Sequence, residues 1–182
     1  MNYKMFELFG DLPDPRRSQG IRHQLDDILI IAVMAILSGH NGIRGFTRFA
    51  KSNETELTQI LRLKHGIPRY NSFLSVFNAI DQTILAQRFT KWVKMYLPEF
   101  EDEHIALDGK SIRATVQNQN SSTQDFVAVV NAFGHQSGVV YGMQAYRNGK
   151  SGEGDALRAL ITRLGMKEVT FTMDALHTKK NF

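Results

Sequence analysis

Residues 104–110 read HIALDGK, and this stretch decides the expected fold. A short apolar run leads directly into Asp108-Gly109, so residues 104–108 are expected to form a strand that ends in a carboxylate. Residues 169–174, VTFTMD, repeat the arrangement further along the chain, because a β-rich run again ends in an aspartate, Asp174. The fold is expected to be built around these two strands.

The residues between the two strands indicate how they are connected. Residues 126–133 and 139–146 are rich in β-forming residues and are separated by GHQSG, which predicts an antiparallel hairpin. Residues 155–164 predict a helix with one apolar face. A crossover helix after the hairpin allows the last strand to lie parallel beside the first, so that Asp108 and Asp174 would be neighbours. Three strands, a helix and a fourth strand are the opening order of an RNase H-like domain.

The first hundred residues predict a helical domain instead. Two prolines make residues 11–17 a turn-rich entry. A helix is expected over residues 28–37, with Asp26 or Asp27 as its N-cap. Further helices are expected from residue 71 or 72 onward and over residues 84–96. The acidic stretch 99–103, EFEDE, is the expected linker. The predicted fold class is therefore α/β, with a helical domain at 1–98 and an incomplete RNase H-like domain at 104–182.

The composition narrows the class of protein. The 182 residues carry 22 Lys and Arg against 18 Asp and Glu, and this net charge of +4 is compatible with nucleic acid as a partner without requiring it. The absence of cysteine excludes disulfides, thiolate-bound zinc and iron–sulfur clusters. The most apolar stretch, residues 28–37, is about half the length that a membrane span needs. We therefore expect a cytoplasmic protein that does not enter a membrane.

The individual site residues have alternative interpretations that the pattern leaves open. Asp108-Gly109 is also a hairpin turn signal, and Asp174 is equally suited to cap a following helix. Glu153 lies in a Lys-Ser-Gly-Glu segment that is also typical of a solvated loop leading into a helix. His177 is more often a satisfied polar side chain than a ligand. Arg44, Arg48 and Lys51, at helical spacing, indicate either a DNA-binding face or an ordinary solvated helix surface.

Several motifs resemble those of one family. Residues 105–113, IALDGKSIR, resemble the IALDGKxxR motif of bacterial insertion-sequence transposases of the H-repeat-associated type, and residues 169–180, VTFTMDALHTKK, resemble the family's TxDAxHTQKK motif. Residues 126–133 and 150–153 resemble its intervening hlVSAF and KSNE segments. Residues 13–50 are similar to the helical domain that precedes the catalytic core. The chain departs from the family at Lys179, where the motif has Gln, and at Gly152-Glu153-Gly154.

The resemblance implies specific roles for these residues. Asp108 and Asp174 would be the first two acids of a DDE triad, acting as catalytic residues and as ligands of Mg²⁺ or Mn²⁺, whose preference for hard oxygen ligands they suit. The third acid of the family, a glutamate, is expected beyond Phe182, so we expect a C-terminally truncated and catalytically incomplete copy. Glu153 precedes Asp174 and is not assigned to the triad.

Three functions follow as hypotheses. The first is DNA cleavage and strand transfer in insertion-sequence transposition, with double-stranded DNA and a second copy of the chain as partners in the nucleoid. The second is a non-catalytic DNA-binding regulator of transposition. The third is a standalone RNase H-like nuclease that takes its missing carboxylate from a partner chain. The residues expected to contact DNA phosphates are Arg16, Arg17, Arg22, Arg44, Arg48, Lys51, Lys110 and Arg113.

Overall fold

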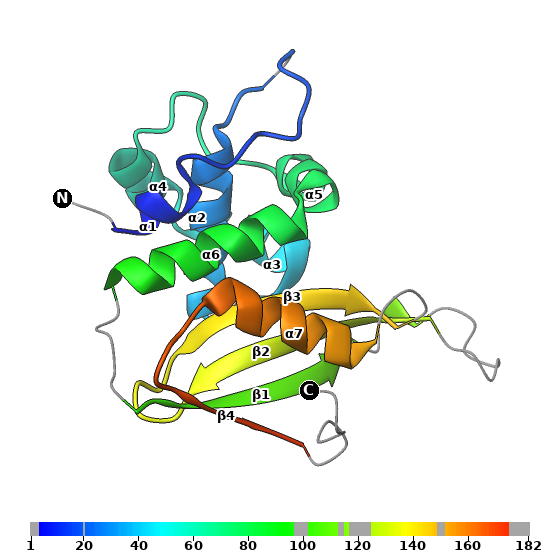
Figure 1. Cartoon of the computed structure of the whole chain (residues 1–182). Coiled ribbons are helices and arrows are strands. Elements are labelled where there is room, and N and C mark those ends of the chain that lie inside the picture. The colour runs from blue at the N-terminus through cyan, green and yellow to red at the C-terminus, as the bar shows by residue number, and fades with distance from the viewer. Residues whose placement is uncertain are drawn as a thin grey trace. The chain divides into compact units, whose positions relative to one another are not determined.

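The structure is a computed structural model that describes residues 4–19, 21–96, 102–112, 115–116, 125–148 and 152–174. The chain divides into two compact units, Met1–Asp81 and Gln82–Phe182, here named the helical unit and the sheet unit. Helices therefore precede a four-stranded mixed sheet, which confirms the α/β class (Figure 1).

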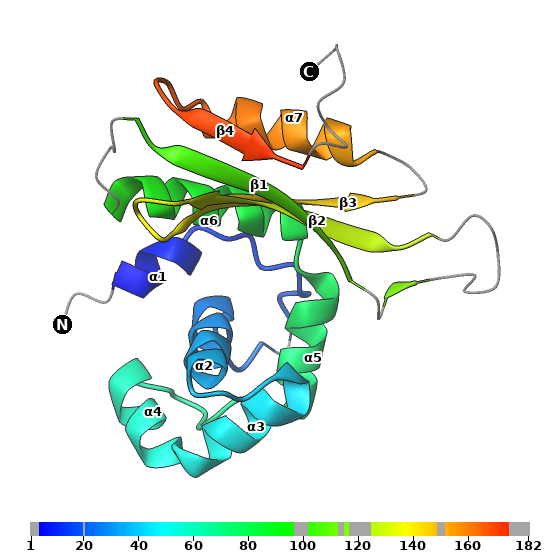
Figure 2. The same ribbon diagram turned by 90° about the horizontal axis from the view of Figure 1, so that it is seen from below.

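The helical unit is built around one central apolar helix. Its helices are α1 (Lys4–Phe9), α2 (Leu25–Leu37), α3 (Gly42–Ser52), α4 (Glu54–Leu61) and α5 (Tyr70–Ala79), as Figure 2 shows. Helix α2 contacts α1, α3 and α5, and its Ile28 and Ile31 are completely buried. Burial of these two side chains stabilises the unit by about 1.5–3 kcal/mol each. Among the described residues, no helix alone is long and apolar enough to cross a membrane; α2 and α3 pass that test only when joined across a 94° bend.

The start of α2 corrects one expectation. The helix begins at Leu25, and its N-cap is Gln24, whose side chain makes no capping hydrogen bond. Asp26 and Asp27 lie in the first turn, where Asp26 Oδ1 accepts a hydrogen bond from the Asp27 N–H. The prediction that either aspartate caps the helix is wrong, because Leu25 is itself buried and extends the apolar face by a further turn. The predicted end after residue 37 is confirmed.

The sheet unit contains the predicted order of elements. It comprises α6 (Gln82–Tyr96), β1 (His104–Ser111), β2 (Val127–Gly134), β3 (Val140–Arg147), α7 (Glu153–Leu164) and β4 (Thr170–Met173). The strand order is β3-β2-β1-β4; β1–β2 and β2–β3 are antiparallel and β1–β4 is parallel. The predicted hairpin, the crossover helix and the parallel fourth strand are confirmed.

Helices α6 and α7 share the core of this unit. Helix α7 lies across β2 and β3, and its Leu157 and Leu160 pack with Ile105 and Val130 of the sheet (Figure 1). A Cβ atom on Gly142 of β3 would lie 3.0 Å from Thr90 Oγ1 of α6 and 3.3 Å from Leu160 Cδ1 of α7. The bare Cα at this position therefore lets both helices approach the strand.

The position of α6 differs from the predicted domain organisation. Its apolar residues Phe89, Trp92 and Val93 pack against the sheet core, and the compact units divide between Asp81 and Gln82. The sequence analysis ended the helical domain at residue 98 instead. A helical repeat reveals that a helix has an apolar face, but it does not reveal which neighbour covers that face.

Glu103, the last residue of the predicted acidic linker, is not a solvated linker residue. Its exposed fraction is 0%, and its carboxylate accepts hydrogen bonds from the N–H groups of Gln136 (2.8 Å) and Ser137 (3.2 Å) and from Tyr141 Oη (3.1 Å). Burial acts to raise the pKa of Glu103, but these hydrogen bonds outweigh it and hold the pKa below its ordinary value. The carboxylate thus fixes the β2–β3 turn to the start of β1. Residues 99–101 of the predicted linker lie outside the described residues.

Candidate functional site

Asp108 lies within a strand and not at a turn. Strand β1 continues past it to Ser111, and the ladder to β2 pairs Asp108 with Asn131 and Gly109 with Val130. The alternative interpretation of Asp108-Gly109 as a hairpin turn is therefore wrong. The side chain of Asp108 is exposed, because it points to the face of the sheet opposite the buried Leu107.

The parallel ladder brings the two predicted aspartates together in register. Its last described pair is Leu107 with Met173, and Asp108 and Asp174 are the next residue on each strand. In-register neighbours on parallel strands point to the same face, so both carboxylates lie at the same end and on the same side of the sheet. Both residues are exposed. Helix capping by Asp174 depends on residues 175 onward, which lie outside the described residues.

A hollow of about 510 Å³ opens beside Asp108. Strands β1 and β2 line it with Ala106, Asp108, Asn131 and Phe133. The other lining residues are Val140 and Met143 of β3 and Phe89 of α6. Asn131 is the register partner of Asp108 and supplies a second polar side chain at the hollow. The sequence analysis did not select Asn131, although a lone amide inside the apolar run FVAVVNAF was a visible signal.

Glu153 lies on the other face of β1. A Cβ atom on Gly109 would lie 1.8 Å from Glu153 Oε1, so the carboxylate of α7 occupies the space that a side chain at 109 would take. Burial, and then the charge and hydrogen bond of Glu153, raise the pKa of Tyr146 on β3. Glu153 therefore lies against Gly109, the residue after Asp108, but on the core face of the sheet. Within the described ranges, no three His, Cys, Asp or Glu residues cluster closely enough to hold a metal ion.

The predicted basic residues fall into separate groups. Lys110 is exposed two residues beyond Asp108, on the same face of β1. Arg44, Arg48 and Lys51 are all exposed on α3, as their spacing predicted. Arg113 lies outside the described residues, as do His177, Lys150 and Ser151.

Arg16 differs from the other predicted phosphate contacts because it is already paired. Its guanidinium contacts the Asp14 carboxylate through two bonds, Nε to Oδ1 (2.9 Å) and Nη2 to Oδ2 (2.6 Å), and Nη2 also donates to the His23 carbonyl (2.9 Å). The hydrogen bond from Arg16 is the main cause of the lowered pKa of Asp14. Only 12% of the Arg16 side chain is exposed. Arg16 therefore holds the 14–23 segment in place.

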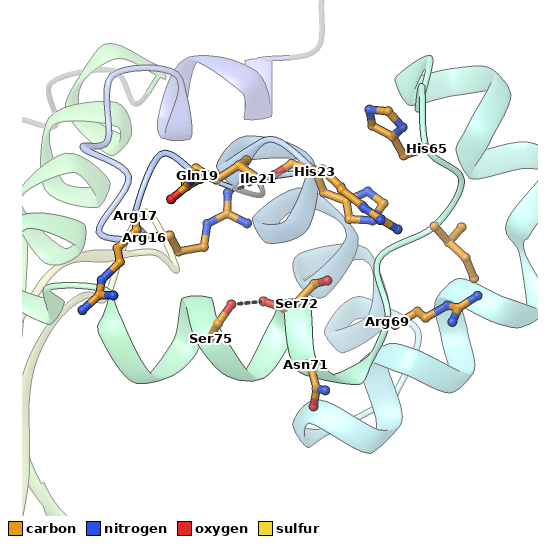
Figure 3. Close-up of a pocket in the computed structure, with 12 residues that line it drawn as sticks. Arg16, Arg17, Gln19, Ile21, His23, His65, Arg69, Asn71, Ser72 and Ser75 are labelled. Carbon is orange, nitrogen blue, oxygen red and sulfur yellow. Dashed lines mark hydrogen bonds between the residues drawn. The ribbon is translucent and has the colours of Figure 1, made fainter.

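Arg17 and Arg22 line a pocket to which a distant segment of the chain also contributes basic residues. His65 and Arg69 line the same pocket, as does His23 (Figure 3). These three residues were not predicted as contacts, because no local pattern shows that residues 16–19 and 21–23 meet residues 65–75.

Comparisons with known proteins agree with the motifs. Residues 6–93 match the family described as DDE_Tnp_1-associated. The chain is 27% identical over 178 residues to "H repeat-associated putative transposase YhhI" of Escherichia coli K12, covering 98% of this chain and 46% of that protein. It is 28% identical over 177 residues to "Putative transposase YncI" of Escherichia coli O157:H7, covering 97% and 45%.

A further relative, "H repeat-associated putative transposase YbfD" of Escherichia coli K12, is 27% identical over 178 residues, covering 98% of this chain and 69% of that protein. The chain thus spans about half the length of two of these relatives and about two thirds of the third. No solved structure matches it significantly. Residues 6–93 therefore carry the helical region of a transposase-associated family, and nearly the whole chain is similar to H repeat-associated putative transposases.

Proposed function

We propose that the sheet unit forms part of a metal-dependent DNA cleavage and strand-transfer site, on an RNase H-like sheet. The observation that carries this proposal is the in-register position of Asp108 and Asp174 on adjacent parallel strands. The order β3-β2-β1-β4, with a helix between β3 and β4, supports the RNase H-like assignment. Similarity to putative transposases supports DNA as the substrate.

The residues present suit a hard divalent cation. Two exposed carboxylates at one end of one sheet face offer the oxygen ligands that Mg²⁺ and Mn²⁺ prefer, and Mg²⁺ is commonly held by one or two carboxylates with water and substrate phosphate completing its shell. Such an ion activates a hydroxyl nucleophile and stabilises the leaving oxygen of a phosphodiester. Asp108 and Asp174 would hold it, and the strand ladder would keep the two carboxylates in place.

The side chains around Asp108 would orient the nucleic acid. Lys110, two residues away on the same face, is placed to neutralise a phosphate next to the cation. Asn131 adds an amide that donates and accepts hydrogen bonds beside Asp108. Phe133 and Met143 add apolar surface beside the carboxylate in the wall of the hollow.

Metal binding tests this proposal directly. Affinity for Mn²⁺ is measured by calorimetric titration of the chain. Asp108→Asn and Asp174→Asn should each weaken binding by more than roughly 10- to 100-fold, which is the cost of losing a residue that only hydrogen-bonds to a metal ligand. Asp102→Asn is the matched control, because Asp102 is an exposed acid of the same unit with φ of 58°, a conformation that Asn tolerates. Equal Mn²⁺ affinity in the wild type and all three variants would overturn the metal assignment.

A second candidate function is DNA binding without catalysis. Arg44, Arg48 and Lys51 form an exposed cationic face on α3, which supports it. The two candidates separate in a nicking assay on supercoiled DNA with Mn²⁺. Cleavage that Asp108→Asn abolishes supports the first function, and DNA binding without any cleavage supports the second.

A further inference from the structure

A basic pocket lies within the helical unit, between two segments that are far apart in sequence. It has a volume of about 520 Å³ and is formed by residues 16–23 on one side and residues 65–75, including the first turns of α5, on the other (Figure 3). Its size falls in the range of about 300–1,000 Å³ that ligand sites occupy. Nothing in the metal site described above uses it.

The charge of this pocket has a single sign. Four arginines and two histidines are among the residues that line it, whereas no aspartate or glutamate of the described chain does. One arginine, Arg16, is held by Asp14, so the remaining positive charge comes from Arg17, Arg22 and Arg69. All three are exposed at their ends, and such an unbalanced cationic hollow attracts anions.

The positive charge is spread along the pocket rather than gathered at one point. In Figure 3, Arg17 lies at one end of the pocket and Arg69 at the other, while the side chains of Ser72 and Ser75 lie between them along α5. Ser75 Oγ donates to the Ser72 carbonyl (3.0 Å), and both serines line the pocket. A single small anion would contact one end only. An extended polyanion would contact both.

His23 adds a charge that depends on the ligand. Burial, followed by the positive charges of His65, Arg16 and Arg22, lowers the pKa of His23. These are the charged groups that face it from both sides of the pocket. A bound anion offsets the repulsion among these cations, and His23 then regains a proton more readily.

We propose that this pocket binds successive phosphate groups of a DNA strand, with Arg17 and Arg69 contacting phosphates at its two ends and with Arg22 and Ser72, which also line it, making further contacts to the strand. Arg16 is a positioning residue, since its bonds to Asp14 and to the His23 carbonyl fix the loop that carries Arg17 and Arg22. The inference rests on the proposed function only in taking DNA as the nucleic acid. It requires no metal ion.

The salt dependence of DNA binding tests the proposal. Fluorescence anisotropy with a labelled DNA duplex, in EDTA and over a series of KCl concentrations, gives the slope of log K against log salt. The double variant Arg17→Gln/Arg69→Gln should weaken binding and reduce the magnitude of this slope by about 2, since each lost phosphate contact removes about 0.9. Arg62→Gln is the matched control: Arg62 is an exposed arginine of the same unit that does not line the pocket.

The outcomes separate this inference from the metal proposal. An unchanged slope in the double variant, or the same reduction in Arg62→Gln, would overturn the pocket assignment while leaving Mn²⁺ binding at Asp108 untouched. Binding of inorganic phosphate by a wild type that shows no affinity for DNA would also overturn the assignment to nucleic acid. Circular dichroism melting confirms that the variants remain folded.

Discussion

Replacement of Glu103 should destabilise the sheet unit far more than its place in an acidic stretch suggests. The carboxylate is completely buried and accepts three hydrogen bonds, two of them from backbone N–H groups of the β2–β3 turn. Hydrogen bonds to a charged group contribute about 1.5–3 kcal/mol each, but the buried charge also carries a desolvation cost of several kcal/mol. Because the three bonds share one buried carboxylate, their contributions do not simply add, and we expect a loss of about 3 kcal/mol for Glu103→Ala. Glu103→Gln, which keeps one carbonyl acceptor, should lose about 1–2 kcal/mol.

Urea unfolding followed by circular dichroism at several pH values measures both effects. Because the folded-state pKa of Glu103 lies below its ordinary value of 4.5, its contribution is complete above that value and is lost as the pH falls toward the folded-state pKa. The wild type should therefore lose more stability than Glu103→Gln between neutral pH and pH values below 4.5. Asp102→Asn serves as the control, because Asp102 is exposed.

Two results would refute this account of Glu103. A loss below about 1 kcal/mol for Glu103→Ala would mean that the turn donors find water at little cost. An identical pH dependence in the wild type and Glu103→Gln would mean that Glu103 does not titrate with a lowered pKa in the folded protein.

Three other predictions concern single groups. The pKa of Asp27 is raised to about 6 by burial and by the adjacent Asp26. Asp27→Asn should therefore stabilise the fold above pH 6 by up to about 1 kcal/mol and bring no gain at pH 4. Equal effects at both pH values in thermal melts would contradict this. Gly109→Ala should displace the Glu153 carboxylate, so the pKa of Tyr146, measured by spectrophotometric titration, should fall toward its ordinary value. An unchanged pKa of Tyr146 would show that Glu153 does not act on it. DNA binding in EDTA should strengthen as the pH falls below 6.5, because the pKa of His23 is lowered from that value, and His23→Asn should flatten this dependence. The same pH profile in the variant would show that His23 does not take up the proton.

The path of the chain around the two aspartates could be predicted because it depends on local patterns and on few topological choices. The apolar runs before Asp108 and Asp174 marked two strands, and the helix between the hairpin and the second run left a parallel pairing as the natural solution. The register that aligns Leu107 with Met173 follows from burial of one face. Whether the two carboxylates bind metal stays a prediction.

Long-range pairing of polar groups could not be predicted. Nothing local distinguishes Glu103 from the exposed Asp102 beside it; only the fold reveals that the β2–β3 turn closes over one of them. The local pattern also does not show which of the adjacent residues Arg16 and Arg17 pairs with Asp14; in the structure it is Arg16. The meeting of residues 16–23 with Arg69 depends on how the helices of the helical unit pack, which hydrophobic periodicity does not specify.

The shortness of β4 links metal affinity to local unfolding. Within the described residues, β4 has four residues and pairs with β1 alone, so its amide hydrogens should exchange with solvent faster than those of β2, which is paired on both sides. An ion held by both Asp108 and Asp174 would bridge the two strands one residue beyond their last pair. Opening of β4 would then require release of the ion, and protection of its amides should rise with the logarithm of the Mn²⁺ concentration above the dissociation constant. The same short ladder weakens the isolated site, since every spontaneous opening of β4 separates the two ligands.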